Sequence, residues 1–155
     1  MPIDLTVYGP PPTVDQIDAL ERRFGVRLPS AYRTFLLTHN GGRVGARRVF
    51  DVPAWPGRQS LVGDLYGILP GHPCDLQDWI EELRHRLPEG LIPVGVDPTG
   101  NFLCLSTSGE DTGTIYYWDA SPDWGLSDED QTLFPVAESI DAFLEDLQDI
   151  EDGAE

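Results

Sequence analysis

The sequence contains no lysine, and none of its ten arginines lies after Arg86. Ten of its 27 carboxylates fall in residues 1–86, where the arginines balance them, so the formal net charge of −17 comes entirely from residues 87–155. Nucleic-acid binding needs a basic surface that pairs with phosphates, and this composition argues against it. A one-sided acidic charge favours a basic protein partner attracted over a long range, although acidic residues also keep small proteins soluble.

Cysteine is scarce too, and we predict that Cys74 and Cys104 are buried free thiols rather than a disulfide. A zinc site needs about four ligands in paired spacing. Only His72 and Cys74 place two candidate ligands close together, so we expect no metal and no cofactor. No stretch approaches the roughly 20 apolar residues of a membrane span. The first residues lack the basic and apolar regions of a signal peptide, and we expect a cytoplasmic protein.

Sequence signatures of catalysis are missing as well. Without lysine there is no phosphate-binding loop ending in Lys-Ser or Lys-Thr, and no Gly-x-Ser-x-Gly nucleophile motif occurs. His39 lies on an apolar helix face just before the predicted end of that helix, which favours a packed or capping histidine over a catalytic base. Residues 97–101 lack the glycine position and the terminal glutamate of a calcium loop, and we interpret them as a turn. We therefore expect no enzymatic activity; an uncharacterised enzyme or small-ligand binder is the alternative.

Four segments have the apolar periodicity of helices. The clearest is Val14–Phe24, which follows a Thr13–Gln16 capping box and is followed by Gly25, a residue suited to end a helix. The other predicted helices open at Leu28-Pro29 and end at Asn40-Gly41-Gly42, run from Leu76 to Leu87 behind an Asp75 cap, and cover Glu138–Ile150.

The centre of the chain, Leu91 to Asp119, is typical of a three-stranded meander. Its predicted strands are Leu91–Val96, Phe102–Leu105 and Ile115–Trp118, and the second is apolar enough to be buried on both faces. Other strands are expected within Arg43–Val52, as one strand or two, over Leu61–Leu69 and at Leu133-Phe134, with a loop at Pro53–Ser60.

These elements predict an α+β fold, because no strand–helix–strand alternation is sustained along the chain. We expect one domain over residues 1–155, in which one curved, mainly antiparallel sheet is flanked by about four helices. Residues 1–12 should be extended, since three consecutive prolines block a helix there, and the acidic residues 151–155 should fray.

Three ordered segments together resemble the SUKH superfamily, which includes the fungal cell-wall regulators of the Smi/Knr type and many bacterial immunity proteins. The segments are Leu20 to Gly42, with Phe24-Gly25, Leu28-Pro29 and Asn40-Gly41-Gly42; Ile92-Pro93-Val94-Gly95 with Asp97, Gly100-Asn101 and Tyr116-Tyr117-Trp118-Asp119; and Val136 to Leu147. Leu65-Tyr66-Gly67 agrees with a further family element, and Asn101 stands where an acidic residue is common. The resemblance implies the curved antiparallel sheet, no catalytic set, and binding of a polymorphic toxin, often a basic nuclease.

The resemblance and the charge distribution lead to one functional hypothesis. We expect a non-enzymatic immunity protein that neutralises a cognate basic toxin through an acidic surface. The alternative is a regulatory or scaffold module like the fungal regulators. The predicted contact residues lie in the hairpin loop, at its exit and beyond: Glu110, Asp111, Asp119, Asp123, Trp124, Asp128, Glu129 and Asp130.

Two tryptophans near the meander exit leave alternatives open. Trp118 and Trp124 flank Asp119 and Asp123, the layout of an aromatic interface anchor inside an acidic rim. Ordinary core packing is the favoured interpretation for Trp118, while Trp124 fits either role.

Overall fold

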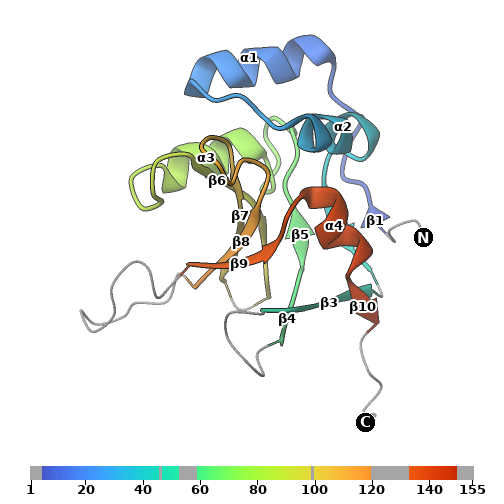
Figure 1. Ribbon diagram of the computed structural model, residues 1–155. Coiled ribbons are helices and arrows are strands. Elements are labelled where there is room, and N and C mark those ends of the chain that lie inside the picture. The colour runs from blue at the N-terminus through green and yellow to red at the C-terminus, as the bar shows by residue number, and fades with distance from the viewer. Residues whose placement is uncertain (1–4, 46, 53–58, 99, 120–132, 150–155) are drawn as a thin grey trace.

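The computed structural model describes residues 5–45, 47–52, 59–98, 100–119 and 133–149 (Figure 1). Within them, seven strands form an antiparallel sheet in the order β1-β2-β5-β6-β7-β8-β9, and three form a second antiparallel sheet in the order β10-β3-β4. The elements are β1 Leu5–Thr6, α1 Val14–Phe24, α2 Ser30–Thr38, β2 Gly42–Val44, β3 Arg47–Asp51, β4 Gln59–Leu61, β5 Asp64–Leu65, α3 Leu76–Leu83, β6 Leu91–Val96, β7 Phe102–Ser106, β8 Ile115–Trp118, β9 Leu133–Ala137, α4 Ile140–Glu145 and β10 Gln148–Asp149. The predicted α+β class with a large antiparallel sheet and four helices is confirmed.

Helix α1 has the predicted bounds, and its ends have the predicted chemistry. The Thr13 hydroxyl accepts a hydrogen bond from the backbone N–H of Gln16, whose side chain accepts one from the backbone N–H of Thr13. Gly25 ends the helix in the left-handed region at φ 67°. Both signals act between neighbours in the chain, which is why the sequence predicted them accurately.

The register of the meander assigns its side chains to two faces. Phe102 pairs with Trp118 and Leu103 pairs with Tyr117, so alternate residues of β7 and β8 project to opposite sides. All five residues of β7 are buried, as its apolar run predicted. The sheet therefore carries apolar side chains on both faces, and each face needs a cover.

Helix α3 covers one face, and α4 with the smaller sheet covers the other (Figure 1). On the first face, the Trp79 ring of α3 contacts the Phe102 ring with centroids 5.5 Å apart. On the second face, the Phe50 ring of β3 lies 5.6 Å from that of Tyr117 and 5.3 Å from that of Phe143 in α4. Helix α1 lies at one end of the molecule, beyond α2 and α3.

Buried polar side chains fasten the loops that join these layers. Asn40, in the left-handed region at φ 54°, donates through Nδ2 to the carbonyls of Pro10 and Ile68 at 2.9 and 3.1 Å. Its Oδ1 accepts a hydrogen bond from the backbone N–H of Ile68 at 2.7 Å. A Cβ at Gly67 would lie 2.0 Å from the Asn40 carbonyl oxygen, so glycine is required at this contact. Asn40 and Gly67 are therefore structural joints, by which we mean buried residues that hold two loops of the fold together.

A second joint ties the β6–β7 turn to the neighbouring strands. The buried carboxylate of Asp97 accepts hydrogen bonds from the Ser60 hydroxyl, the Tyr117 hydroxyl and the backbone N–H of Asn101, at 2.9, 2.8 and 2.9 Å. The Asn101 amide donates to the Tyr117 hydroxyl at 2.7 Å. Asp97 and Asn101 are thus hydrogen-bonded to each other across the connection between β6 and β7, and Asp97 contributes to packing of the fold.

The predicted single strand over Leu61–Leu69 is wrong. Residues up to Leu61 pair with β3 in the small sheet, whereas Asp64 and Leu65 pair with β2 and β6 in the large sheet. The chain changes sheets at Gly63, whose N–H donates to the Val96 carbonyl at 2.9 Å and where a Cβ would come within 3.2 Å of that oxygen. The same exchange explains why Arg43–Val52 contains two strands, one per sheet.

The predicted final helix over Glu138–Ile150 is also too long. Helix α4 ends at Glu145, and Gln148–Asp149 instead forms β10, which pairs with β3. Carboxylates at a helix C-terminus oppose the helix dipole, and this end has no basic residue to compensate. The edge of β3 offers the backbone an alternative set of partners. Helix α3 is likewise shorter than predicted and ends at Leu83.

Candidate partner-binding surface

The β7–β8 loop carries two of the predicted contact residues, and the structure separates their roles. The Asp111 carboxylate accepts hydrogen bonds from the hydroxyls of Tyr116 and Ser106, at 2.5 and 2.9 Å. The Tyr116 bond is the main cause that lowers the pKa of Asp111, and the same bond raises the pKa of Tyr116 to about 12. Asp111 therefore braces the loop. Glu110 is exposed, with no hydrogen bond or ion pair in the described part of the chain, and is available to a partner.

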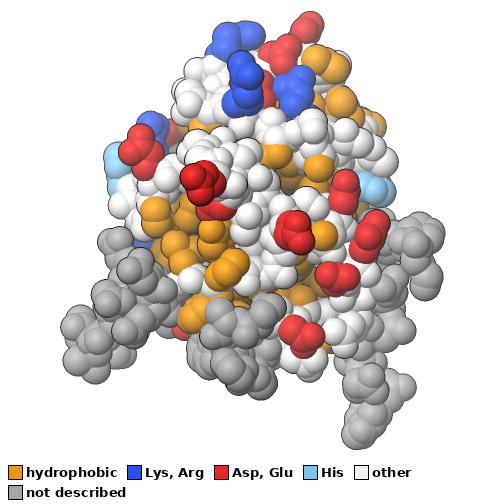
Figure 2. Space-filling model, viewed as in Figure 1, with side chains coloured by type: hydrophobic (Ala, Val, Ile, Leu, Met, Phe, Trp, Pro, Cys, Tyr) orange, Lys and Arg blue, Asp and Glu red, His pale blue; other side chains and the backbone are white. Residues whose placement is uncertain are grey.

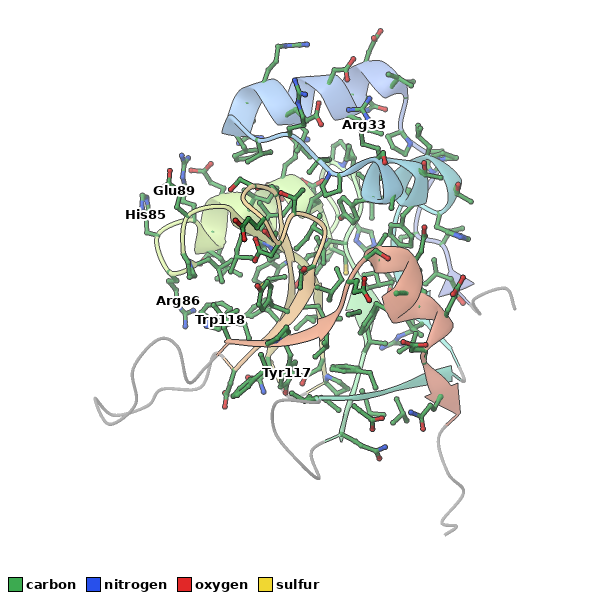
Figure 3. The ribbon with its side chains drawn as sticks, viewed as in Figure 1. Arg33, His85, Arg86, Glu89, Tyr117 and Trp118 are labelled. Atoms are coloured by element: carbon green, nitrogen blue, oxygen red, sulfur yellow. The ribbon has the colours of Figure 1, made fainter. Side chains whose placement is uncertain are left out.

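The other predicted contacts divide between the end of β8 and residues that the structure does not describe. Asp119 is half-buried at the end of the meander. Asp123, Trp124, Asp128, Glu129 and Asp130 lie outside the described residues. Trp118 is only 7% exposed; it packs on Phe102, and the Arg86 guanidinium lies 5.1 Å from the centroid of its ring (Figure 3). The core role favoured for Trp118 is confirmed.

Exposed carboxylates of α4 extend the acidic surface beyond the loop. A Cβ on Gly113 would lie 3.6 Å from the Glu138 carbonyl oxygen, so the loop adjoins the entry to α4. From there Figure 2 shows Asp and Glu side chains spread over the region of α4, while arginines gather over α1. We call this surface the acidic band and define it by these exposed residues: Glu110, Glu138, Asp141, Glu145, Asp146 and Asp51.

The acidic band includes a hollow between α4 and the small sheet. Its volume is about 270 Å³; Phe50, Val136 and Phe143 are among its lining residues, as are Asp51 and Asp146. The amide groups of Gln59 and Gln148 donate to the Asp51 carboxylate at 2.8 and 3.4 Å. These bonds orient one carboxylate at the junction of β3, β4 and β10. Acidic groups beside an aromatic surface can accommodate a guanidinium or ammonium group.

The sequence prediction did not include the carboxylates of α4. They were visible as the polar face of the last predicted helix, in a half of the chain without a basic residue. What the sequence could not show is that this helix follows the hairpin loop in space. The contact between Gly113 and Glu138 joins segments that are separated by β8 and β9 along the chain.

Two of the three histidines have structural contacts, and both thiols are poorly reactive. The Nδ1 atom of His72 accepts a hydrogen bond from the backbone N–H of Cys74, and its ring stacks on that of Tyr8, with ring centroids 4.6 Å apart. His39 packs against Phe35 at the end of α2. Burial raises the pKa of Cys74 to about 11 and raises that of Cys104 as well, so neither thiol is an activated nucleophile. Both are free, as predicted; Cys104 is buried and Cys74 only partly so.

The described residues contain no group of three or more His, Cys, Asp or Glu residues placed to hold a metal ion. None of the helices described is long and apolar enough to cross a bilayer.

Comparison with known proteins identifies the family of the chain. A sequence model of the SMI1 / KNR4 family (SUKH-1) matches residues 11–146. The chain belongs to this family. It is also 29% identical to the SPbeta prophage-derived uncharacterized protein YokK of Bacillus subtilis (strain 168), over 162 aligned positions that cover 95% of this chain and 80% of the relative.

Membership in SUKH-1 places the chain in a superfamily of immunity proteins that generally act by binding protein partners rather than by catalysis. Several residues through which the sequence resembled the family are buried joints, including Asn40, Gly67, Asp97 and Asn101. In this chain these residues stabilise the fold. Asn40, Asp97 and Asn101 are buried and do not form an exposed surface.

Proposed function

We propose that this SUKH-1 protein is an immunity protein that binds and neutralises a basic bacterial toxin in the cytoplasm. The observation that supports it best is the acidic band, which combines exposed carboxylates of the β7–β8 loop, α4 and β3. A toxin that acts on nucleic acid carries a basic substrate groove, because that groove must pair with phosphates. A complementary acidic surface would fill such a groove and exclude the substrate.

Electrostatic attraction would act on both the rate and the strength of this association. Steering by complementary charge raises association rates above the roughly 10⁵–10⁶ M⁻¹s⁻¹ of neutral surfaces. Close charge pairs at such interfaces couple by about 1.5–7 kcal/mol when they are desolvated. The hollow beside Asp51 and Asp146 provides a position for one such desolvated pair with a basic side chain of the toxin.

The test uses the product of the gene beside this one as the candidate toxin. Asp141→Arg with Glu145→Arg reverses two exposed charges of the acidic band. The matched control is Asp15→Arg with Glu82→Arg, which changes net charge equally on exposed positions of α1 and α3. Binding is measured by titration calorimetry at low and high salt.

We expect the acidic-band variant to bind at least about tenfold more weakly and with a shallower salt dependence, while the control binds normally. The surface assignment fails if the two variants behave alike. The function itself fails if the neighbouring gene product neither binds nor harms cells that lack this protein. In that case, co-purification with signalling or cell-wall proteins would support the regulatory alternative.

A further inference from the structure

The hollow between α4 and the small sheet has negative charge at its edge and an apolar interior. Asp51, Asp146 and Gln148 line it at exposed positions. Phe50 and Phe143 also line it but are only 4% and 2% exposed, so they lie deeper. Its described lining contains two carboxylates and no basic residue. A ligand that fills the hollow must therefore carry positive charge and tolerate an apolar surface.

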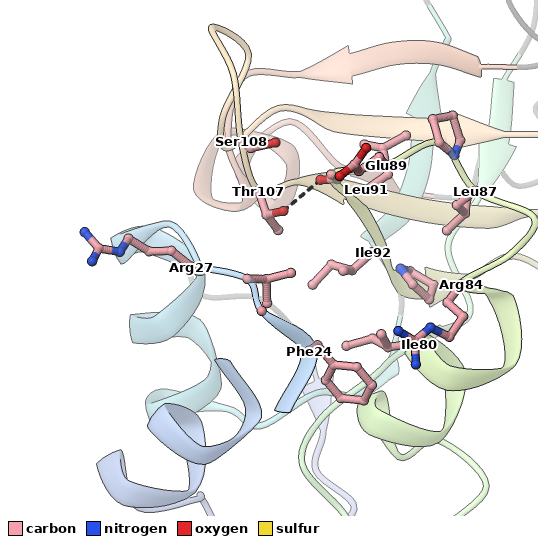
Figure 4. Close-up of a pocket in the computed structure, with 15 residues that line it drawn as sticks. Phe24, Arg27, Ile80, Arg84, Leu87, Glu89, Leu91, Ile92, Thr107 and Ser108 are labelled. Carbon is pink, nitrogen blue, oxygen red and sulfur yellow. Dashed lines mark hydrogen bonds between the residues drawn. The ribbon is translucent and has the colours of Figure 1, made fainter. Parts of the chain in front are cut away.

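A larger groove between the end of α1, α3 and the start of β6 has no such preference (Figure 4). Its volume is about 560 Å³, and its charged lining residues are Arg27, Arg84 and Glu89. Arg84 already pairs with Glu81 at 3.4 Å, which leaves one arginine and one carboxylate. Opposite charges in equal number do not select the charge of a ligand.

The size of the hollow beside α4 favours a single side chain as its occupant. Its volume of about 270 Å³ is below the roughly 300–1,000 Å³ of pockets that hold whole small molecules. A bare metal ion is disfavoured too, because the part of the chain that the structure describes has no cluster of three or more metal-ligating residues. A basic side chain of a protein partner fits both the volume and the charge.

Two amide groups fix the carboxylate of Asp51 and leave it able to bind a guanidinium group. The Nε2 atom of Gln59 donates to Oδ1 at 2.8 Å, and that of Gln148 donates to Oδ2 at 3.4 Å. A carboxylate oxygen has two lone-pair sites, so each oxygen keeps one for a further donor. The amides add no positive charge that would offset the carboxylate. An arginine presents two parallel N–H groups that match such a pair of oxygens, whereas a lysine does not.

The apolar interior also favours arginine over lysine. A guanidinium group is planar and weakly hydrated, so its face can lie against Phe50 and Phe143 while its N–H groups reach the carboxylates at the edge. A lysine ammonium group is strongly hydrated and would lose that water against an apolar surface. The C-terminus of α4 adds partial negative charge beside Asp146, and no basic residue of its last turn offsets it.

We propose that this hollow binds one arginine side chain of the basic partner and selects arginine over lysine. The Asp51 carboxylate accepts two hydrogen bonds from the guanidinium group, whose face contacts Phe50 and Phe143. Asp146 adds a second negative charge at the edge. The identity of the partner rests on the proposed function, whereas the preference for arginine follows from the hollow itself.

The test titrates the isotope-labelled full-length protein with N-acetyl-arginine methylamide and follows its backbone amide signals by NMR at constant ionic strength. We expect saturable shifts at Asp51, Phe143 and Gln148, with millimolar affinity because one side chain makes few contacts. The corresponding lysine derivative should bind at least about threefold more weakly. The neutral citrulline derivative should give no saturable shift. Asp51→Asn with Asp146→Asn should abolish saturable binding of the arginine derivative, since the charged acceptors are removed.

The matched control is Glu138→Gln with Asp141→Asn, which removes the same charge from exposed positions of the acidic band outside the hollow. It should bind the arginine derivative as the wild type does. Equal weakening in the control would overturn the proposal, because long-range attraction would then explain the effect. Equal affinity for the arginine and lysine derivatives, or no saturable shift in the wild type, would also overturn it.

Strand β3 itself contains Arg47 and Arg48. Saturable shifts that appear only in Arg47→Gln with Arg48→Gln would overturn the proposal in favour of an arginine of this chain as the occupant. The titration uses no toxin, so its failure leaves the immunity function standing. Conversely, a neighbouring gene product that does not bind would refute that function without changing the preference of the hollow for arginine.

Discussion

Asn40 is one of the residues through which the sequence resembles the SUKH superfamily. Its substitution tests whether it stabilises the fold rather than binds a partner. The Asn40 side chain is fully buried and makes three hydrogen bonds to the backbone of Pro10 and Ile68. In Asn40→Ala the C=O of Pro10 and both the N–H and the C=O of Ile68 lose their hydrogen-bond partner. Each lost bond contributes about 1 kcal/mol. A non-glycine residue that lacks a local polar side chain adds about 1 kcal/mol in the left-handed region.

These contributions predict that Asn40→Ala lowers the free energy of unfolding by about 4 kcal/mol. For a chain of this size that corresponds to a fall in Tm of about 10 °C. Asn40→Gly loses the same hydrogen bonds without the Cβ strain, so it should be about 1 kcal/mol more stable than the alanine variant. Thr34→Ala, at an exposed position of α2, is the control and should stay within about 0.5 kcal/mol of the wild type.

Urea unfolding followed by circular dichroism measures all four proteins. A loss below about 1 kcal/mol in Asn40→Ala would refute the reasoning, because the buried backbone groups would then have found other partners. An Asn40→Gly variant no more stable than Asn40→Ala would refute the contribution of the backbone conformation. Toxin binding by the fraction that remains folded should be unchanged, since Asn40 is buried away from every exposed surface.

Two further predictions follow from the hydrogen bonds and burial of the ionisable groups. Tyr116→Phe should cost about 1 kcal/mol near neutral pH. The raised pKa of Tyr116 means that its contribution is complete below its unfolded value of about 10 and is lost as pH rises towards 12. The pKa of Asp111 is lowered in the folded protein, so its carboxylate stabilises the fold above the unfolded pKa. That stabilisation is lost as pH falls through the folded pKa of Asp111. The free energies of unfolding of the wild type and Tyr116→Phe, measured across this pH range, give the difference in stability. A difference that does not change with pH would contradict the hydrogen bond between Tyr116 and Asp111. Cys74 should react slowly with Ellman's reagent at pH 8, and Cys104 only after unfolding; rapid labelling of Cys104 in the folded protein would show that it is not buried.

Local signals in the sequence predicted the bounds of some elements to within one residue. Helix α1 depends on a capping box and a glycine, which lie within the helix or at its flanking residues Thr13 and Gly25. Strand β7 depends on its own apolar run, which is buried throughout. In both cases the stabilising groups lie close in sequence, so the local sequence is enough to predict the element.

The errors occurred where partners distant in sequence compete for the backbone. The stretch Leu61–Leu69 has a strand-like composition, yet it is divided between two sheets because β3 and β6 lie in different layers. The stretch after Glu145 has a helical stripe, yet β3 takes Gln148–Asp149 as an edge strand. A periodic pattern gives the propensity of a segment but not which neighbour it will meet.

The division of charge was determined by the sequence alone, because no fold can place a basic residue in 87–155. The prediction of a basic partner rests on this division of charge. Only the tertiary structure decided which carboxylates share a surface: it brought the β7–β8 loop beside α4, and it committed Asp111 to Tyr116 while leaving Glu110 exposed. Charge is a property of each residue, whereas a binding surface is a property of the distances between residues, and those distances are determined only when the chain packs.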